Sequence, residues 1–229
     1  RESDANHPKK KYRPIASGII PVPFAFFSFV FLFSGILLLL FFFFPIQIFS
    51  LFLLYFLYSV FYSFFLKEQF LLDVFSLSIG FIIRILIGAA VIRVEPSLWI
   101  LSMTFFVSLW FGFSKRYQEL SFGTSTRKVL AYYSEDLLRI LLSMMTTILI
   151  VIYVFYAYTE HPRDSIILSV PVFVFVLVRY LSIILTSKQK EKSIEDILLS
   201  DATILVSGFI MVACLIFAFI PDYLTAFFM

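Results

Sequence analysis

The chain has 229 residues, of which 61% are hydrophobic and 14% are charged, and its formal net charge is +3. Soluble globular domains contain about 45–50% apolar and about 25% charged residues, so this composition excludes an ordinary soluble domain and indicates an integral membrane protein. The single cysteine, Cys214, excludes a disulfide framework and a cluster of thiolate metal ligands. The sequence contains no nucleic-acid-binding motif, glycine-rich phosphate loop or nucleophile elbow, so nucleic acid is not expected as a partner.

The chain begins with a polar segment, residues 1–18, that holds two acids, a histidine and five bases within its first thirteen residues. It is followed directly by an apolar run. Because a charged segment held at a membrane edge can bind phosphate, the segment supplies four candidate site residues: Asp4, His7, Lys10 and Arg13.

Seven low-charge segments follow, each long enough to cross a hydrocarbon core of about 30 Å as a helix. They are residues 19–44, 46–66, 70–94, 97–113, 137–159, 164–186 and 202–220. Their apolar runs are continuous, without the polar alternation of a barrel strand, so the predicted fold is all-α, a polytopic transmembrane helix bundle.

The bases are distributed unevenly between the connections of this bundle. Thirteen of the 18 Lys and Arg residues lie on the side of the amino terminus, in residues 1–18, 67–69, 114–136 and 187–201. The positive-inside rule therefore places this face, with nearly all of the titratable groups, in the cytoplasm.

The segment 70–94 contains two charged residues, Asp73 and Arg84, which are eleven residues apart. Eleven steps of about 100° return to nearly the same helical face, so both are expected to point into one cleft, with Arg84 about 16 Å deeper. Charges within a span usually face a polar interior and indicate function, although Arg84 could serve packing alone. Lys67 precedes the same helix and could also be a snorkelling interfacial base.

The polar connection 114–136 combines bases, hydroxyls and an acid, of which Lys115, Arg116, Glu119, Arg127 and Tyr133 are site candidates. Arg and Lys are the usual ligands of phosphate oxygens, while a purely topogenic role would explain the bases equally well. Ser134 precedes two acids and is predicted to cap the next helix.

Residues 193–201 interleave acids and apolar side chains like a short interfacial helix, which places Asp196 near the cytoplasmic surface and Asp201 before the last span. Together with Asp4, Asp73 and Glu119, these acids are spread over the cytoplasmic side. Mg²⁺ commonly binds one or two carboxylates together with substrate phosphates, so a metal-bridged diphosphate is the predicted ligand.

The amino-terminal segment contains a specific motif, Asp-x-x-His-Pro-x-Lys-x-x-Arg-Pro-Ile-Ala-x-Gly, formed by Asp4, His7, Pro8, Lys10, Arg13, Pro14, Ile15, Ala16 and Gly18. With this motif the chain resembles the UbiA-type membrane transferase superfamily and, within it, the decaprenyl-phosphate phosphoribosyltransferases. The agreement continues through Lys67-Glu68, Asp73-Val74, Gly80-Phe81, Arg84, Lys115-Arg116, Glu119-Leu120 and Glu195-Asp196-Ile197-Leu198-Leu199 with Asp201.

The resemblance implies one membrane-embedded UbiA-like domain over residues 1–229, with seven helices of an expected nine. The other two helices, and the Asn and two Asp residues that open the first aspartate motif, are expected before Arg1, so the 229 residues alone are expected to lack turnover. The second aspartate motif of the prenyltransferases is replaced by residues 115–119, which favours a sugar-phosphate donor.

The implied activity is Mg²⁺-dependent transfer of the 5-phosphoribosyl group from 5-phosphoribosyl 1-diphosphate to polyprenyl (decaprenyl) phosphate, which yields a lipid-linked precursor for cell-envelope polysaccharide. The implied location is the cytoplasmic membrane of a bacterium, with the active face in the cytoplasm. A prenyltransferase acting on an aromatic acceptor and a non-enzymatic channel or transporter remain as alternatives.

The expected roles divide the candidates into three groups. Asp4 is the expected metal ligand, and with Asp73 and Glu119 it forms the catalytic group. Asp196 and Asp201 are substrate-binding or structural acids. The residues expected to bind substrate phosphates are His7, Lys10, Arg13, Lys67, Arg84, Lys115, Arg116, Arg127 and Tyr133.

Overall fold

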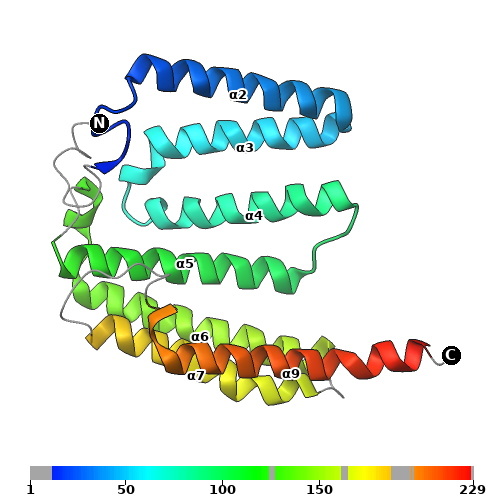
Figure 1. Cartoon of the computed structure of the whole chain (residues 1–229). Coiled ribbons are helices and arrows are strands. Elements are labelled where there is room, and N and C mark those ends of the chain that lie inside the picture. The colour runs from blue at the N-terminus through cyan, green and yellow to red at the C-terminus, as the bar shows by residue number, and fades with distance from the viewer. Residues whose placement is uncertain (1–11, 124–126, 161–164, 187–196, 198, 228–229) are drawn as a thin grey trace. The chain divides into compact units, whose positions relative to one another are not determined.

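The computed structural model describes residues 12–123, 127–160, 165–186, 197 and 199–227 (Figure 1). Within these residues there is no strand, which confirms the all-α prediction. The α-helices are α2 (Val22–Phe43), α3 (Ile46–Phe64), α4 (Leu72–Ile92), α5 (Leu98–Ser121), α6 (Glu135–Glu160), α7 (Ser169–Thr186) and α9 (Ala202–Phe227). The short 3-10 helices are η2 (Leu66–Glu68), η3 (Lys128–Tyr132) and η4 (Ser165–Leu168).

The helices from α2 to α7 are long and apolar enough to cross a membrane. The last helix, α9, is apolar over Ala202–Ile216. This agrees with the predicted polytopic membrane bundle, because each of the seven predicted segments overlaps one of these helices.

The chain forms two compact units. Unit 1 consists of Arg1–Phe64 and Ile83–Glu95, and unit 2 of Phe65–Ile82 and Pro96–Met229. Helix α4 therefore gives its first half to unit 2 and its second half to unit 1. The prediction of a single domain over residues 1–229 stays a prediction.

Unit 1 is built on the hairpin of α2 and α3, which run side by side in opposite directions (Figure 1). Pro45 lies in the turn, and the Phe33 and Phe56 rings pack between the helices with their centroids 4.3 Å apart. No residue of α2 is buried within the protein. Its surface of Phe and Leu side chains is suited to contact with lipid, where such exposure has no hydrophobic cost.

The core of unit 2 lies where α5 packs against α6 and α6 against α7. Trp110 of α5 is buried there, and its indole N–H donates to Thr146 Oγ1 of α6 at 2.9 Å. Its ring also packs against Tyr180 of α7, with centroids 4.6 Å apart. The three helices are thus joined by one aromatic cluster whose polar N–H has a partner, as a buried tryptophan requires.

The start of α4 lies very close to α5 within unit 2. Val74 is buried against Gly112, where a Cβ would overlap Val74 Cγ1. Gly112 therefore allows the close approach of the two helices that carry the buried charges described below.

The predicted boundary of the fourth span was wrong. We expected that span to end at residue 113 and a polar connection to follow, but α5 continues to Ser121 and buries much of its last two turns. The predicted cap of the next helix is confirmed. Helix α6 begins at Glu135, and Ser134 Oγ accepts from the Leu137 N–H at 3.2 Å. The expected interfacial helix at 193–201 falls largely outside the described residues.

Candidate active site

A buried group of charged and hydroxyl side chains joins three elements of unit 2. Asp73 of α4 accepts two hydrogen bonds, from Arg116 Nε at 2.7 Å and from the Tyr133 hydroxyl at 2.7 Å. Arg116 Nη1 donates to Glu119 Oε2 within α5. The exposed fractions are 0% for Asp73, 4% for Arg116 and 5% for Glu119 and for Tyr133. We call these four residues the Asp73 cluster.

The local sequence explains how Asp73 reaches its partners. Asp73 lies in the first turn of α4, where the helix dipole favours a negative charge. Leu71, just before the helix, has φ +62°, a left-handed conformation that is costly for a leucine. Its N–H donates to the Tyr133 hydroxyl at 3.2 Å. Tyr133 therefore holds both the turn and the carboxylate that follows it.

The same contacts explain why α5 is longer than its hydropathy indicates. Arg116 and Glu119 are one turn apart, so their side chains lie on the same helical face and can pair. Arg116 also pairs with Asp73, so two of its three guanidinium nitrogens are bonded to carboxylates. A charged turn can be buried in this way because its charges are paired and hydrogen-bonded.

Burial affects the titration of Tyr133. Desolvation by burial raises the pKa of its phenol above the ordinary value, and the hydrogen bond to Asp73 and the charge of that carboxylate raise it further. Since an unperturbed tyrosine titrates near pH 10, the hydroxyl remains protonated at neutral pH and donates to Asp73.

Exposed bases come from the elements that the cluster joins. Lys67 lies on η2, directly before α4; Lys115 precedes Arg116 on α5; and Arg127 precedes η3. All three are exposed. Helices η2 and η3 pack against each other, and the Phe70 ring lies 4.9 Å from that of Tyr133. Unit 2 thus combines a buried charged cluster with three exposed bases on the same or adjoining elements, which we call the basic rim. Exposed bases of this kind can contact phosphates in water.

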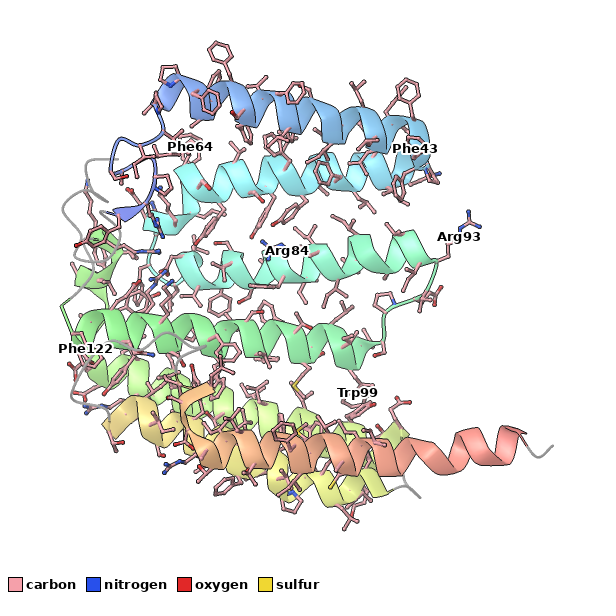
Figure 2. The ribbon with its side chains drawn as sticks, viewed as in Figure 1. Phe43, Phe64, Arg84, Arg93, Trp99 and Phe122 are labelled. Atoms are coloured by element: carbon pink, nitrogen blue, oxygen red, sulfur yellow. The ribbon has the colours of Figure 1, made fainter. Side chains whose placement is uncertain are left out.

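The remaining predicted residues have other settings. In unit 1, Arg13 is exposed before α2, and Arg84 Nε donates to the Tyr55 hydroxyl at 2.7 Å, with the guanidinium 5.1 Å from the ring centroid. Arg84 belongs to the middle of α4 (Figure 2). Because Asp73 and Arg84 belong to different units, their expected common cleft stays a prediction. Four predicted residues lie outside the described residues: Asp4, His7, Lys10 and Asp196.

Asp201 has the geometry of a helix cap. Its Oδ1 accepts from the N–H of Ile204 at 3.0 Å and from the Thr203 hydroxyl, and its Oδ2 accepts from Arg179 at 2.8 Å. The hydrogen bond from Arg179, followed by that from Thr203, lowers the pKa of this carboxyl well below its ordinary value. Asp201 thus fixes the start of α9 and ties it to α7.

Among the described residues, no group of three or more His, Cys, Asp and Glu side chains is arranged to hold a metal ion. The carboxylates of Asp73 and Glu119 are bonded to Arg116 instead. The Mg²⁺ site therefore stays a prediction.

Comparison with known proteins agrees with this architecture. Residues 1–195 match the family model described as the UbiA prenyltransferase family. This chain belongs to the UbiA prenyltransferase family. The resemblance expected from the motif at Asp4 is therefore confirmed, and the two units are parts of a UbiA family protein.

Three similar relatives are each named decaprenyl-phosphate phosphoribosyltransferase. That of Mycolicibacterium smegmatis is 32% identical over 169 residues, 72% of this chain and 53% of the relative. That of Corynebacterium glutamicum is 27% identical over 227 residues, 95% of this chain and 68% of the relative. That of Mycobacterium tuberculosis is 28% identical over 165 residues. The chain spans about half the length of the first and third relatives.

Proposed function

We propose that this UbiA family protein transfers a 5-phosphoribosyl group to a polyprenyl phosphate such as decaprenyl phosphate. The donor in this proposal is 5-phosphoribosyl 1-diphosphate. A phosphate oxygen of the lipid forms a bond to C1 of the ribose, while the bond from C1 to the diphosphate oxygen breaks and the diphosphate leaves with the bonding electrons.

The observation that supports this proposal is similarity to relatives that carry this activity in their names, over as much as 95% of the chain. The site geometry is compatible with it, because both substrates and the leaving group are phosphates and unit 2 presents the exposed bases Lys67, Lys115 and Arg127. Neutralising phosphate charge and positioning the two substrates are the main contributions a protein makes to such a displacement.

The Asp73 cluster has a different part in the proposal. Its members are buried and bonded to one another, so they hold α4, α5 and the residues around η3 together. Mg²⁺ belongs to the proposal as the ion that would neutralise the diphosphate, with Asp4 as its protein ligand. The proposed location is the bacterial cytoplasmic membrane with the basic rim in the cytoplasm, and the proposed product serves cell-envelope polysaccharide synthesis.

The test is a transfer assay on membranes that contain the protein. Donor labelled in the ribose ring is mixed with decaprenyl phosphate and Mg²⁺, and we expect the label to enter the organic-soluble lipid fraction. Chelation of the metal should abolish the transfer. Transfer of an isoprenyl group to an aromatic acid without use of the donor would reject the proposal, as would solute flux in liposomes without any lipid product.

A further inference from the structure

Unit 2 contains a cavity at the end of α5 opposite to the Asp73 cluster. Figure 2 shows Trp99 and Phe122 at opposite ends of this helix. Trp99 and Arg116 are about 26 Å apart along its axis, at about 1.5 Å per residue. The cavity has a volume of about 320 Å³. Its lining includes the aromatic and apolar side chains of Trp99, Ile100, Met103, Ile152, Tyr153 and Tyr156. It is too far from the basic rim to hold the reacting phosphates.

Three aromatic rings stand around this cavity. The centroids of Trp99 and Tyr156 are 6.2 Å apart with an interplanar angle of 63°, and those of Tyr153 and Tyr156 are 6.3 Å apart. A cation is attracted to a ring face within about 6 Å of the centroid, and tryptophan and tyrosine are the strongest such rings. Tyr153 also stacks on Phe173 with centroids 4.2 Å apart, so at most one face of the Tyr153 ring is open to the cavity.

A carboxylate adjoins the rings. The Trp99 indole N–H donates to Glu160 Oε1 at 2.7 Å, and Glu160 is the last residue of α6. The hydrogen bond holds the negative charge beside a ring that lines the cavity. Ile100 and Met103 add apolar surface.

We propose that this cavity binds an organic ammonium ion with a small apolar body. The rings and the carboxylate favour a cation over a neutral molecule of the same shape, and the apolar wall favours alkyl groups on the nitrogen. The volume is at the lower end of the range of about 300–1,000 Å³ for ligand pockets, which fits a small amine or a lipid head group. The site is independent of the phosphate chemistry proposed above.

The competing explanation is that the aromatic residues only anchor the helix ends at the membrane interface, as tryptophan and tyrosine often do. Charge separates the two explanations. Choline and its neutral isostere 3,3-dimethylbutan-1-ol would be titrated into the protein in maltoside detergent, with tryptophan fluorescence as the readout. We expect choline to bind at least about tenfold more tightly than the isostere.

Glu160→Gln keeps an oxygen acceptor for the Trp99 N–H and removes the charge. It should weaken choline binding about tenfold and leave the isostere unchanged. Tyr156→Leu should weaken choline binding by a similar factor because it removes a ring but keeps the apolar wall. Glu95→Gln is the matched control: this exposed acid does not line the cavity, so the variant should bind choline like the parent protein.

Two sources of the ammonium group can be distinguished in nanodiscs. If phosphatidylethanolamine added to phosphatidylglycerol discs competes with choline, the natural ligand is a lipid head group. If it does not compete, the ligand is a soluble amine. Equal binding of choline and the isostere, binding of neither, or normal choline binding by Glu160→Gln would each overturn the proposal.

Discussion

Replacing Arg116 by methionine tests the Asp73 cluster directly. The change removes a buried cation and leaves the carboxylates of Asp73 and Glu119 buried, with 0% and 5% exposure. Two hydrogen bonds to charged groups are lost, each with a net value of about 1.5–3 kcal/mol. The sum agrees with the cost of about 3–5 kcal/mol for breaking a buried ion pair by removing one partner. We therefore expect Arg116→Met to lower the free energy of unfolding by about that amount.

The assay is unfolding of the purified protein in mixed micelles with increasing SDS, followed by circular dichroism. Lys115→Met is the matched control, because the adjacent lysine is exposed and its loss should change the free energy by no more than about 0.5 kcal/mol.

A triple variant distinguishes lost charge pairing from lost packing. Combining Arg116→Met with Asp73→Asn and Glu119→Gln removes all three charges at nearly constant volume. Since neutral groups are much cheaper to bury than isolated charges, the triple variant should recover at least half of the stability lost by the single variant. A single variant within about 1 kcal/mol of the parent, or a triple variant less stable than the single one, would refute the reasoning.

Three further outcomes are expected in the same unfolding assay. Gly112→Ala should cost about 1–3 kcal/mol because the new methyl group overlaps the buried Val74, and Gly112→Ala with Val74→Ala should lose less than the two changes added. Tyr133→Phe should cost about 1–3 kcal/mol because both hydroxyl partners lose their bond. The pKa of Asp201 is lowered in the folded protein, so this carboxylate contributes to the free energy of unfolding above about pH 4, and the contribution is lost as the pH falls through the folded-state pKa. Asp201→Asn should remove that pH dependence of stability.

The positions of the helices followed from the sequence because lipid imposes a simple requirement. A spanning segment must be continuously apolar and must satisfy its own backbone, and each of the seven apolar runs satisfies both. The end of α5 did not follow, because the charges of Arg116 and Glu119 indicate a connection when only neighbouring residues are considered. The charge of Arg116 is neutralised by Asp73, 43 residues earlier, and no local pattern reports such a partner.

The candidate site likewise has features that local sequence predicts and features that depend on distant partners. The sequence predicted a role for Asp73 from its charge within a span, and it named Arg116, Glu119 and Tyr133 as candidates from their chemistry. It did not predict that all four form one buried cluster, because this depends on how α4, α5 and the residues around η3 pack. The capping role of Asp201 had a local signal, an acid three residues before Ile204 at a helix start.

The sequence assigned Lys115 and Arg116 to the same role in phosphate binding, but the two bases differ in burial. A substrate phosphate must enter and leave through water, so its ligands have to be accessible, and Lys115 meets this condition. Arg116 is 4% exposed and already bonded to two carboxylates, which suits a positioning residue. Under the proposed function, Lys115→Met should raise the KM for the phosphoribosyl donor and leave the free energy of unfolding unchanged. Arg116→Met should mainly lower the free energy of unfolding. Equal effects of the two variants on both measurements would show that burial does not separate the roles of these adjacent residues.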